Sequence, residues 1–271
     1  MHGLGNDFVI VDARGAAFAP RSELIRQICD RHTGVGGDQL LVIEPATAPG
    51  SDARMRIYNI DGAESQTCLN ATRCVAWLLL REDGRDAVTV ETLGGLIEAR
   101  LAGDMAVTLH LPPPRRDWRD IPLARPADTD RLDMASGPLR DPGAVSMGNP
   151  HLVCFVPDRD AVDVPAFAPA LADHPLLPEG ANIGVAQIAG PDRIRLVVWE
   201  RPGILTRACG SGACAAFVVA RSRGLIDAAS ATVEMPGGTL EIAQDDDGTI
   251  LLTGPVAIAF QGRLPRDMRA A

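Results

Sequence analysis

The chain has 271 residues, of which 46% are hydrophobic, enough to build one large or two ordinary domains. Its formal net charge is -9, and an acidic chain makes nucleic acid and anionic membranes poor partners. All 26 of its Lys+Arg residues are arginine. Without a lysine the chain can form neither the Schiff base of a pyridoxal-phosphate enzyme nor a Walker A loop, and we expect no cofactor.

The N-terminal residues lack the pattern of a secretory signal, and the apolar runs are too short to span a bilayer. We therefore expect a cytoplasmic protein. Thiols stay reduced in that compartment, so we expect no structural disulfides. The six cysteines are Cys29, Cys68, Cys74, Cys154, Cys209 and Cys214.

The first part of the chain predicts mostly strands, at residues 8–11, 40–43, 55–58, 88–91, 96–99 and 106–111. A helix with a serine cap is expected over residues 22–31. Residues 74–82 are apolar all round, which is typical of a buried helix, and residues 214–223 predict a second one. Between these parts, the proline-rich residues 112–116 predict a linker.

The chain also repeats itself. Val88-Thr-Val-Glu-Thr-Leu-Gly-Gly returns 143 residues later as Ala231-Thr-Val-Glu-Met-Pro-Gly-Gly, and Gly5-Asn6 returns as Gly148-Asn149 at the same offset. Gln39 lies 143 residues before Asn182, and Cys68 lies 141 residues before Cys209. Matches in the same order at nearly one offset indicate two halves with one architecture.

The predicted fold class is therefore α+β, with two pseudo-symmetric domains, each a mostly antiparallel sheet wrapped around a central helix. We place the domains at residues 1–111 and 112–271, and we expect a final strand at about 254–262 to return to the first domain. A site in a cleft between the domains is the natural expectation for such an arrangement.

Two cysteines begin the two predicted central helices. A helix N-terminus carries partial positive charge and free N–H groups, which lower a thiol pKa and bind carboxylates. Thiols on opposite faces of one carbon suit stereochemical inversion, in which one removes a proton and the other returns one. The competing interpretation is zinc at Cys68 and Cys74 or at Cys209 and Cys214, but this spacing on one helix converges poorly on one ion, so we expect no metal.

The sequence resembles the diaminopimelate epimerase family. The motifs that carry the resemblance are Met1-His-Gly-Leu-Gly-Asn-Asp-Phe, Gly34-Val-Gly-Gly-Asp-Gln, Tyr58-Asn-Ile-Asp-Gly, Cys68-Leu-Asn-Ala-Thr-Arg-Cys, Gly148-Asn-Pro-His, Trp199-Glu-Arg and Ala208-Cys-Gly-Ser-Gly-Ala-Cys. The resemblance implies interconversion of L,L- and meso-diaminopimelate on the route to lysine and peptidoglycan. The expected partners are this small amino-acid substrate and a second copy of the chain in a homodimer.

The resemblance also implies site residues. Cys68 and Cys209 would be the acid/base pair, and His151 and Glu200 would support proton transfer. Asn6 and Gln39 would hold the reacting amino end, and backbone N–H groups of Leu69, Asn70, Gly210 and Ser211 would bind the reacting carboxylate. The distal end of the substrate would be held by Asn59, Asn149, Asn182 and Arg201, with Glu200 also placed among the substrate-binding residues.

Other interpretations stay open at this stage. The asparagines beside turns are commonly turn residues, and a histidine such as His151 is commonly a satisfied strand residue. A relative acting on another substrate, or a binding protein that lost turnover, is the alternative function. It is motivated by Leu69, Pro202 and Ile204, which stand where the family usually has glycine, and Ala71 is a milder departure of the same kind.

Overall fold

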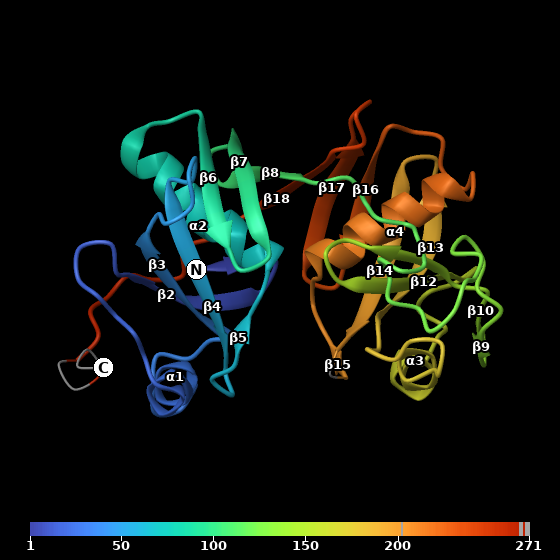
Figure 1. The fold of residues 1–271 in the computed structure, drawn as a ribbon, viewed down its shortest axis with the longest axis horizontal. Helices are drawn as coiled ribbons and strands as arrows, with labels where there is room; N and C mark the ends of the chain where they lie inside the picture. The colour runs from blue at the N-terminus through green and yellow to red at the C-terminus, as the bar shows by residue number, and fades with distance from the viewer. Residues whose placement is uncertain (202, 266–267, 269–271) are drawn as a thin grey trace. The chain divides into compact units, whose positions relative to one another are not determined.

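The computed structural model describes residues 1–201, 203–265 and 268. Its contacts divide the chain into two compact units. Unit 1 is Met1–His110 together with the C-terminal residues from Thr253, and unit 2 is Leu111–Leu252. Each unit is a mostly antiparallel sheet folded around one central helix (Figure 1), so the predicted α+β class is confirmed.

Unit 1 places its strands in the order β1-β2-β3-β4-β6-β7-β8, with β5 paired to β4. Only its β2–β3 and β4–β6 pairs are parallel among the pairs described in this unit. The strands are β1 (His2–Gly3), β2 (Asn6–Asp12), β3 (Gln39–Pro45), β4 (Ala53–Asn59), β5 (Glu64–Ser65), β6 (Ala87–Thr92), β7 (Gly95–Gly103) and β8 (Ala106–Leu111), and the helices are α1 (Ser22–Cys29) and α2 (Leu69–Asp83).

Unit 2 follows the same plan, with β17-β16-β14-β13-β12-β11 in sequence across its sheet and β15 paired to β14. Its strands are β11 (Gly143–Ser146), β12 (Pro150–Phe155), β13 (Asn182–Gly190), β14 (Arg193–Glu200), β15 (Ile204–Leu205), β16 (Ser230–Met235) and β17 (Gly238–Gln244), with the small pair β9 (Ala135–Ser136) and β10 (Leu139–Arg140). Strand β18 (Ile250–Pro255) begins in unit 2 and ends in the residues of unit 1 that start at Thr253. Its helices are α3 (Val164–Ala172) and α4 (Gly210–Ser222).

The strand registers reproduce the sequence repeat. Phe8 lies opposite Gln39 in the parallel β2–β3 pair, and His151 lies opposite Asn182 in the parallel β12–β13 pair. Ala53 pairs with Val90 in unit 1, as Ile194 pairs with Val233 in unit 2. Matching registers place equivalent residues at equivalent strand ends, because a slip of one residue would turn every side chain to the other face.

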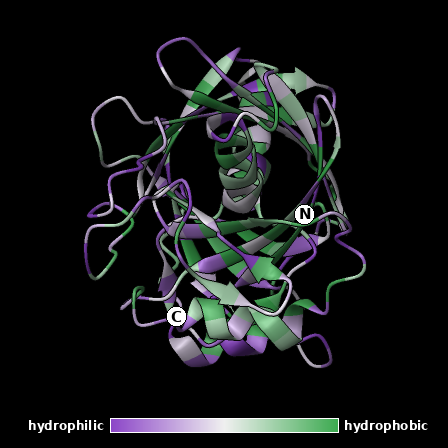
Figure 2. Ribbon diagram, turned by 90° about the vertical axis from the view of Figure 1, so that its right-hand side faces the viewer, coloured by the Kyte–Doolittle hydropathy of each residue, from purple (hydrophilic) through white to green (hydrophobic). Residues whose placement is uncertain are grey.

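The central helices are enclosed by strands, and Figure 2 shows one of them end-on inside its ring of strands. In α4 the residues from Gly212 to Ala220 are buried, and Cys74 and Cys214 are 0% exposed within α2 and α4. Cys29 and Cys154 are also buried, as expected of small core residues. Both central helices begin directly after Cys68 and Cys209, the two cysteines expected at the helix starts, and so extend beyond the apolar runs at residues 74–82 and 214–223.

Two other helices differ from the expectation. Helix α1 ends at Cys29, and its N-cap is Arg21, so the predicted serine cap is wrong and Ser22 is the first helical residue. Helix α3 was not predicted because its prolines, Pro165 and Pro169, obscure the helical pattern, yet Asp163 caps it by accepting from the Ala166 N–H at 3.3 Å. No helix in the described ranges is both long and apolar enough to cross a membrane.

Candidate active site

Cys68 is the N-cap residue of α2, with extended backbone angles of φ -143° and ψ 106°. Its carbonyl accepts from the Thr72 N–H at 2.9 Å, which is the first bond of the helix, and its side chain is half-buried. The Cys68 Sγ lies 3.7 Å from Asn6 Oδ1. Leu69 and Asn70 begin the first turn of α2, and backbone N–H groups at a helix start are suited to bind an anion.

Three amide side chains of unit 1 lie at the ends of neighbouring strands. Asn6 begins β2, Gln39 begins β3, and Asn59 ends the antiparallel β4 opposite Gln39. Gln39 Nε2 donates to Asn59 Oδ1 at 2.8 Å. This bond leaves the Gln39 oxygen free to accept and the Asn59 NH2 free to donate, since each amide carries one acceptor and one donor group.

Cys209 occupies the equivalent N-cap position of α4, with φ -129° and ψ 109°. Its Sγ accepts from the Gly212 N–H at 3.4 Å and lies 3.6 Å from Ser211 Oγ. Its own N–H lies 3.5 Å from the Met235 sulfur. Cys209 is only 5% exposed, so this thiol is more deeply enclosed within its unit than Cys68 is.

Burial and the Glu200 carboxylate raise the pKa of Cys209 well above its ordinary value. The Gly212 N–H and Ser211 hydroxyl at the helix start act in the opposite direction but do not outweigh them. The expectation that a helix start lowers the pKa of this thiol is therefore wrong for the unit as it stands, because desolvation is the larger effect.

Glu200 ends β14 close to Cys209. Burial raises the pKa of its carboxyl, while the Thr206 hydroxyl, 2.5 Å from Glu200 Oε1, lowers it. Thr206 was not among the predicted site residues. It follows β15, whose pairing with β14 folds the chain back beside Glu200, and no local pattern in the sequence marks that contact.

His151 is 1% exposed, and its Nε2 lies 3.0 Å from Asn149 Oδ1. Burial lowers the pKa of its ring to about 3, so the imidazole is neutral and its Nε2–H donates to Asn149. Asn182 Oδ1 accepts from the Arg201 N–H at 3.0 Å, and Arg201 Nη1 donates to the Glu179 carbonyl at 2.7 Å. Both asparagines therefore keep an NH2 group available to an acceptor.

Three of the residues that the resemblance places at glycine positions lie in the described part of the chain. Leu69 is the first residue of α2 and is buried, and Ala71 is fully buried in the same turn. Ile204 lies in strand β15 and is 57% exposed. The described non-glycine residues with positive φ are Leu4, Pro122 and Asp141, so neither Leu69 nor Ile204 is strained in that way. Pro202 lies outside the described residues.

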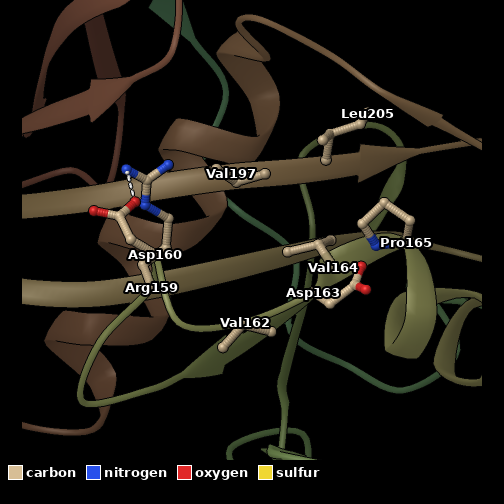
Figure 3. A pocket seen from close by; sticks show the side chains of 8 residues that line it. All are labelled: Arg159, Asp160, Val162, Asp163, Val164, Pro165, Val197 and Leu205. Atoms are coloured by element: carbon tan, nitrogen blue, oxygen red, sulfur yellow. Dashed lines mark ion pairs between the residues drawn. The ribbon is translucent and has the colours of Figure 1, made fainter.

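A pocket of 230 Å³ lies elsewhere in unit 2 (Figure 3). Its walls include Val197 of β14, Leu205 of β15 and Arg159, which is paired with Asp160 at 2.6 Å. None of the predicted site residues lines this pocket. The candidate site is instead the set of polar groups around the two helix starts, taken unit by unit.

Solved structures with this fold include a hydroxyproline epimerase from Agrobacterium vitis, which superimposes with a TM-score of 0.63 and is 16% identical, covering 94% of this chain and 87% of that one. A solved structure of a phenazine biosynthesis protein of the PhzF family from Bacillus anthracis superimposes with a TM-score of 0.65, covering 94% of this chain and 92% of that one. Its sequence is 18% identical, so this likeness concerns the fold.

The sequence profile of the diaminopimelate epimerase family matches residues 1–115 and 143–259. The diaminopimelate epimerase of Phenylobacterium zucineum (strain HLK1) is 49% identical over 269 residues, which cover 98% of this chain and 96% of the relative. That of Rhodospirillum centenum (strain ATCC 51521 / SW) is 52% identical over 264 residues, which cover 97% and 90%. The chain belongs to the diaminopimelate epimerase family.

Proposed function

We propose that this protein interconverts L,L- and meso-diaminopimelate without a cofactor, on the route to lysine and peptidoglycan precursors. The observation that carries the proposal is the equivalent place of Cys68 and Cys209, each the N-cap of the central helix of its unit, in a chain of this family. The absence of lysine from the sequence argues against pyridoxal-phosphate chemistry.

In the proposed reaction, one cysteine thiolate removes the α-proton and the other cysteine thiol gives a proton to the opposite face of the same carbon. The C–H bond that breaks and the one that forms balance, and the two sulfurs exchange protonation states. The roles reverse with the stereoisomer that is bound, so the pair shares one proton. The mechanism requires both thiols to reach one α carbon.

The polar groups of each unit suit the charged ends of the substrate. N–H groups of Leu69, Asn70, Gly210 and Ser211 would bind the reacting carboxylate at the two helix starts. The oxygens of Asn6 and Gln39 are acceptors for the reacting ammonium group. The free NH2 groups of Asn59, Asn149 and Asn182 and the guanidinium of Arg201 would hold the distal end, where arginine can grip a carboxylate through two hydrogen bonds.

His151 and Glu200 take supporting parts in the proposal. His151, as a neutral ring, donates to Asn149 and so orients its NH2 group. Glu200 lies beside Cys209 and acts on the protonation of that thiol. We also propose a cytoplasmic location, which the acidic composition and the proposed substrate favour.

The test is to incubate the protein with L,L-diaminopimelate in deuterated water and to follow exchange at the α carbon and formation of the meso isomer by NMR. Exchange with inversion is expected. Binding without exchange would indicate a protein that kept the site and lost turnover, and exchange of another amino acid alone would indicate a racemase for a different substrate.

Cys68→Ala is expected to abolish inversion, because one face of the carbon then has no proton donor or acceptor. Loss should exceed about 100-fold in kcat, the range in which a general acid or base contributes. Cys74→Ala, which removes a buried thiol two turns into the same helix, serves as the control and should keep activity. Inversion at the normal rate in Cys68→Ala would refute the two-thiol mechanism.

A further inference from the structure

A fully buried guanidinium lies just beyond Cys68 in α2. Arg73 is 0% exposed, and its Nη2 donates to Asn70 Oδ1 at 2.8 Å. Strand β1 passes closely over this pair, since a Cβ added at Gly3 would lie 3.0 Å from Arg73 Nη2. A buried charge is costly unless it is held by polar partners, and the proposed reaction gives Arg73 no task.

The side-chain amides of Asn70 and Asn6 connect Arg73 to Asp38 beside the Cys68 thiol. Asn70 Nδ2 donates to Asn6 Oδ1 at 3.3 Å, and Asn6 Nδ2 donates to Asp38 Oδ2 at 2.9 Å. The Asp38 carboxylate is itself fixed by Arg31, whose Nη2 lies 2.9 Å from Asp38 Oδ1, and by the Asp7 N–H at 3.2 Å from Oδ2.

The two ionic ends set the direction of this chain. A guanidinium can only donate and an ionised carboxylate can only accept. Arg73 therefore takes the oxygen of Asn70, and Asp38 takes the NH2 of Asn6. The oxygen of Asn6 must then face inward, where it lies 3.7 Å from the Cys68 sulfur. A reversed Asn6 amide would place NH2 beside that sulfur instead.

Unit 2 does not repeat these ionic ends. The residue 143 positions after Asp38 is Ala181, and the residues 141 positions after Asn70 and Arg73 are Ser211 and Cys214. There the sulfur of Cys209 accepts from the Gly212 N–H. The two thiols thus meet different groups, an amide oxygen at Cys68 and an N–H donor at Cys209.

We propose that Arg73 and Asp38 are positioning residues that hold the Asn6 amide with its oxygen toward Cys68. The oxygen accepts from the Cys68 thiol and favours its protonated form. On the function proposed above, the same oxygen also accepts from the ammonium group of the substrate. Neither Arg73 nor Asp38 touches the reacting atoms in this arrangement.

Asp38→Leu tests the Asp38 end by removing the acceptor that holds the Asn6 NH2. The amide is then free to turn its NH2 toward the sulfur, which stabilises the thiolate. We expect iodoacetamide to alkylate Cys68 about 3- to 10-fold faster at neutral pH, as a lost hydrogen bond of about 1 kcal/mol implies. Cleavage after arginine yields the peptide 57–73, in which Cys68 is the sole cysteine, so mass spectrometry reads this rate directly.

Substrate binding should weaken in the same variant. In Asp38→Leu the KM for L,L-diaminopimelate should rise, because an NH2 group repels the ammonium group. Asp12→Leu is the matched control, since Asp12 lies at the other end of β2 and is paired with Arg14 at 2.6 Å. Asp12→Leu should change neither the alkylation rate of Cys68 nor the KM. Buried Cys74 reports on folding, because its alkylation rises only if α2 opens.

Arg73 is tested by a pair of variants. Arg73→Met removes the donor to Asn70 and should raise Cys68 alkylation, while Arg73→Lys keeps a donor and should stay nearer the wild-type rate. If Arg73→Met does not fold, Arg73→Lys and Asp38→Leu carry the test. Unchanged or slower Cys68 alkylation in Asp38→Leu, with Cys74 still protected, would overturn the proposal. If wild-type protein shows no epimerisation while the alkylation change appears, the proposed function fails and the positioning role stands.

Discussion

Burial and hydrogen bonding shift the pKa of the Glu200 carboxyl in opposite directions. Burial raises the pKa of Glu200, and the Thr206 hydroxyl lowers it by stabilising the ionised form. Glu200 in turn raises the pKa of Cys209. The Thr206 hydroxyl and the Cys209 thiol both favour the ionised form of Glu200 against burial, which is the larger effect, so on the proposed function Thr206 helps to set the protonation of Glu200 beside the thiol.

Thr206→Val keeps the shape of the side chain but removes the hydroxyl. Because the lost hydrogen bond lowered the pKa of Glu200, that pKa rises, and the acid limb of the pH profile of kcat/KM should move to higher pH. Activity at neutral pH should fall by about 10-fold, the scale of one hydrogen bond to a charged group. Thr206→Ser restores the donor and should restore the profile. An acid limb that does not move in Thr206→Val would show that Glu200 does not need this bond.

Single residues also show where sequence reasoning ends. The repeat and the motifs pointed to Cys68, Cys209 and Glu200 from the sequence, because their spacing is visible along the chain. Thr206 and Asp38 act through contacts that exist only after strands pair. Asp38 stands inside the Gly34-Val-Gly-Gly-Asp-Gln motif, yet its bond joins the residue just before β3 to Asn6 at the start of β2, and no local pattern reveals it.

At the scale of elements, the starts of α2 and α4 matter most. Their first turns contain Asn70 and Thr72 in one unit and Gly210 to Gly212 in the other, which carry no apolar period, so the apolar pattern begins only at Cys74 and Cys214, and it was the matched positions of Cys68 and Cys209 that indicated the starts. Leu69 nonetheless lies in this turn as a buried residue and keeps its N–H. The substitution for glycine therefore adds packing without removing the donor that the proposed carboxylate contact needs.

Leu69→Gly is expected to lower the free energy of unfolding by about 2 to 4 kcal/mol, from lost burial and the conformational freedom of glycine. The KM for L,L-diaminopimelate should change by less than about 3-fold, since the backbone donor is retained. Urea unfolding and steady-state kinetics measure the two effects. Leu69→Ala separates them, because it loses the burial but keeps a Cβ. A fall of KM by about 10-fold in Leu69→Gly would show instead that the leucine crowds the carboxylate.

Across the whole molecule, the two units share their strand registers and each encloses thiols that take no part in the proposed reaction. Cys74 in unit 1 and Cys154 in unit 2 are both fully buried. The nearly constant offset between matching segments made this duplication predictable from the sequence. The contacts divide the chain at Leu111 and Thr253, where the sequence suggested a boundary after residue 111 and a returning strand at about 254–262. The C-terminal residues from Thr253 join unit 1 through contacts such as the 2.7 Å contact between the Thr108 and Thr253 hydroxyls.

The buried thiols make both units less stable at alkaline pH. Burial raises the pKa of Cys74 and of Cys154 from 9.0 to about 12. Below pH 9.0 both thiols are protonated whether the chain is folded or not, so their contribution is fully present. Above it, the unfolded chain releases these protons first, and stability falls as the pH rises toward about 12.

At about pH 10 each thiol should lower the free energy of unfolding by about 1.4 kcal/mol relative to neutral pH. Cys74→Ala and Cys154→Ala should each be less stable at neutral pH, through the lost sulfur contacts, but each should show a shallower alkaline decline. The residues lie in different units, so the double variant should lose about 3 kcal/mol less between neutral pH and about pH 10 than the wild type does. Urea midpoints across this range measure the decline, and an identical slope in wild type and double variant would mean that other groups govern alkaline stability.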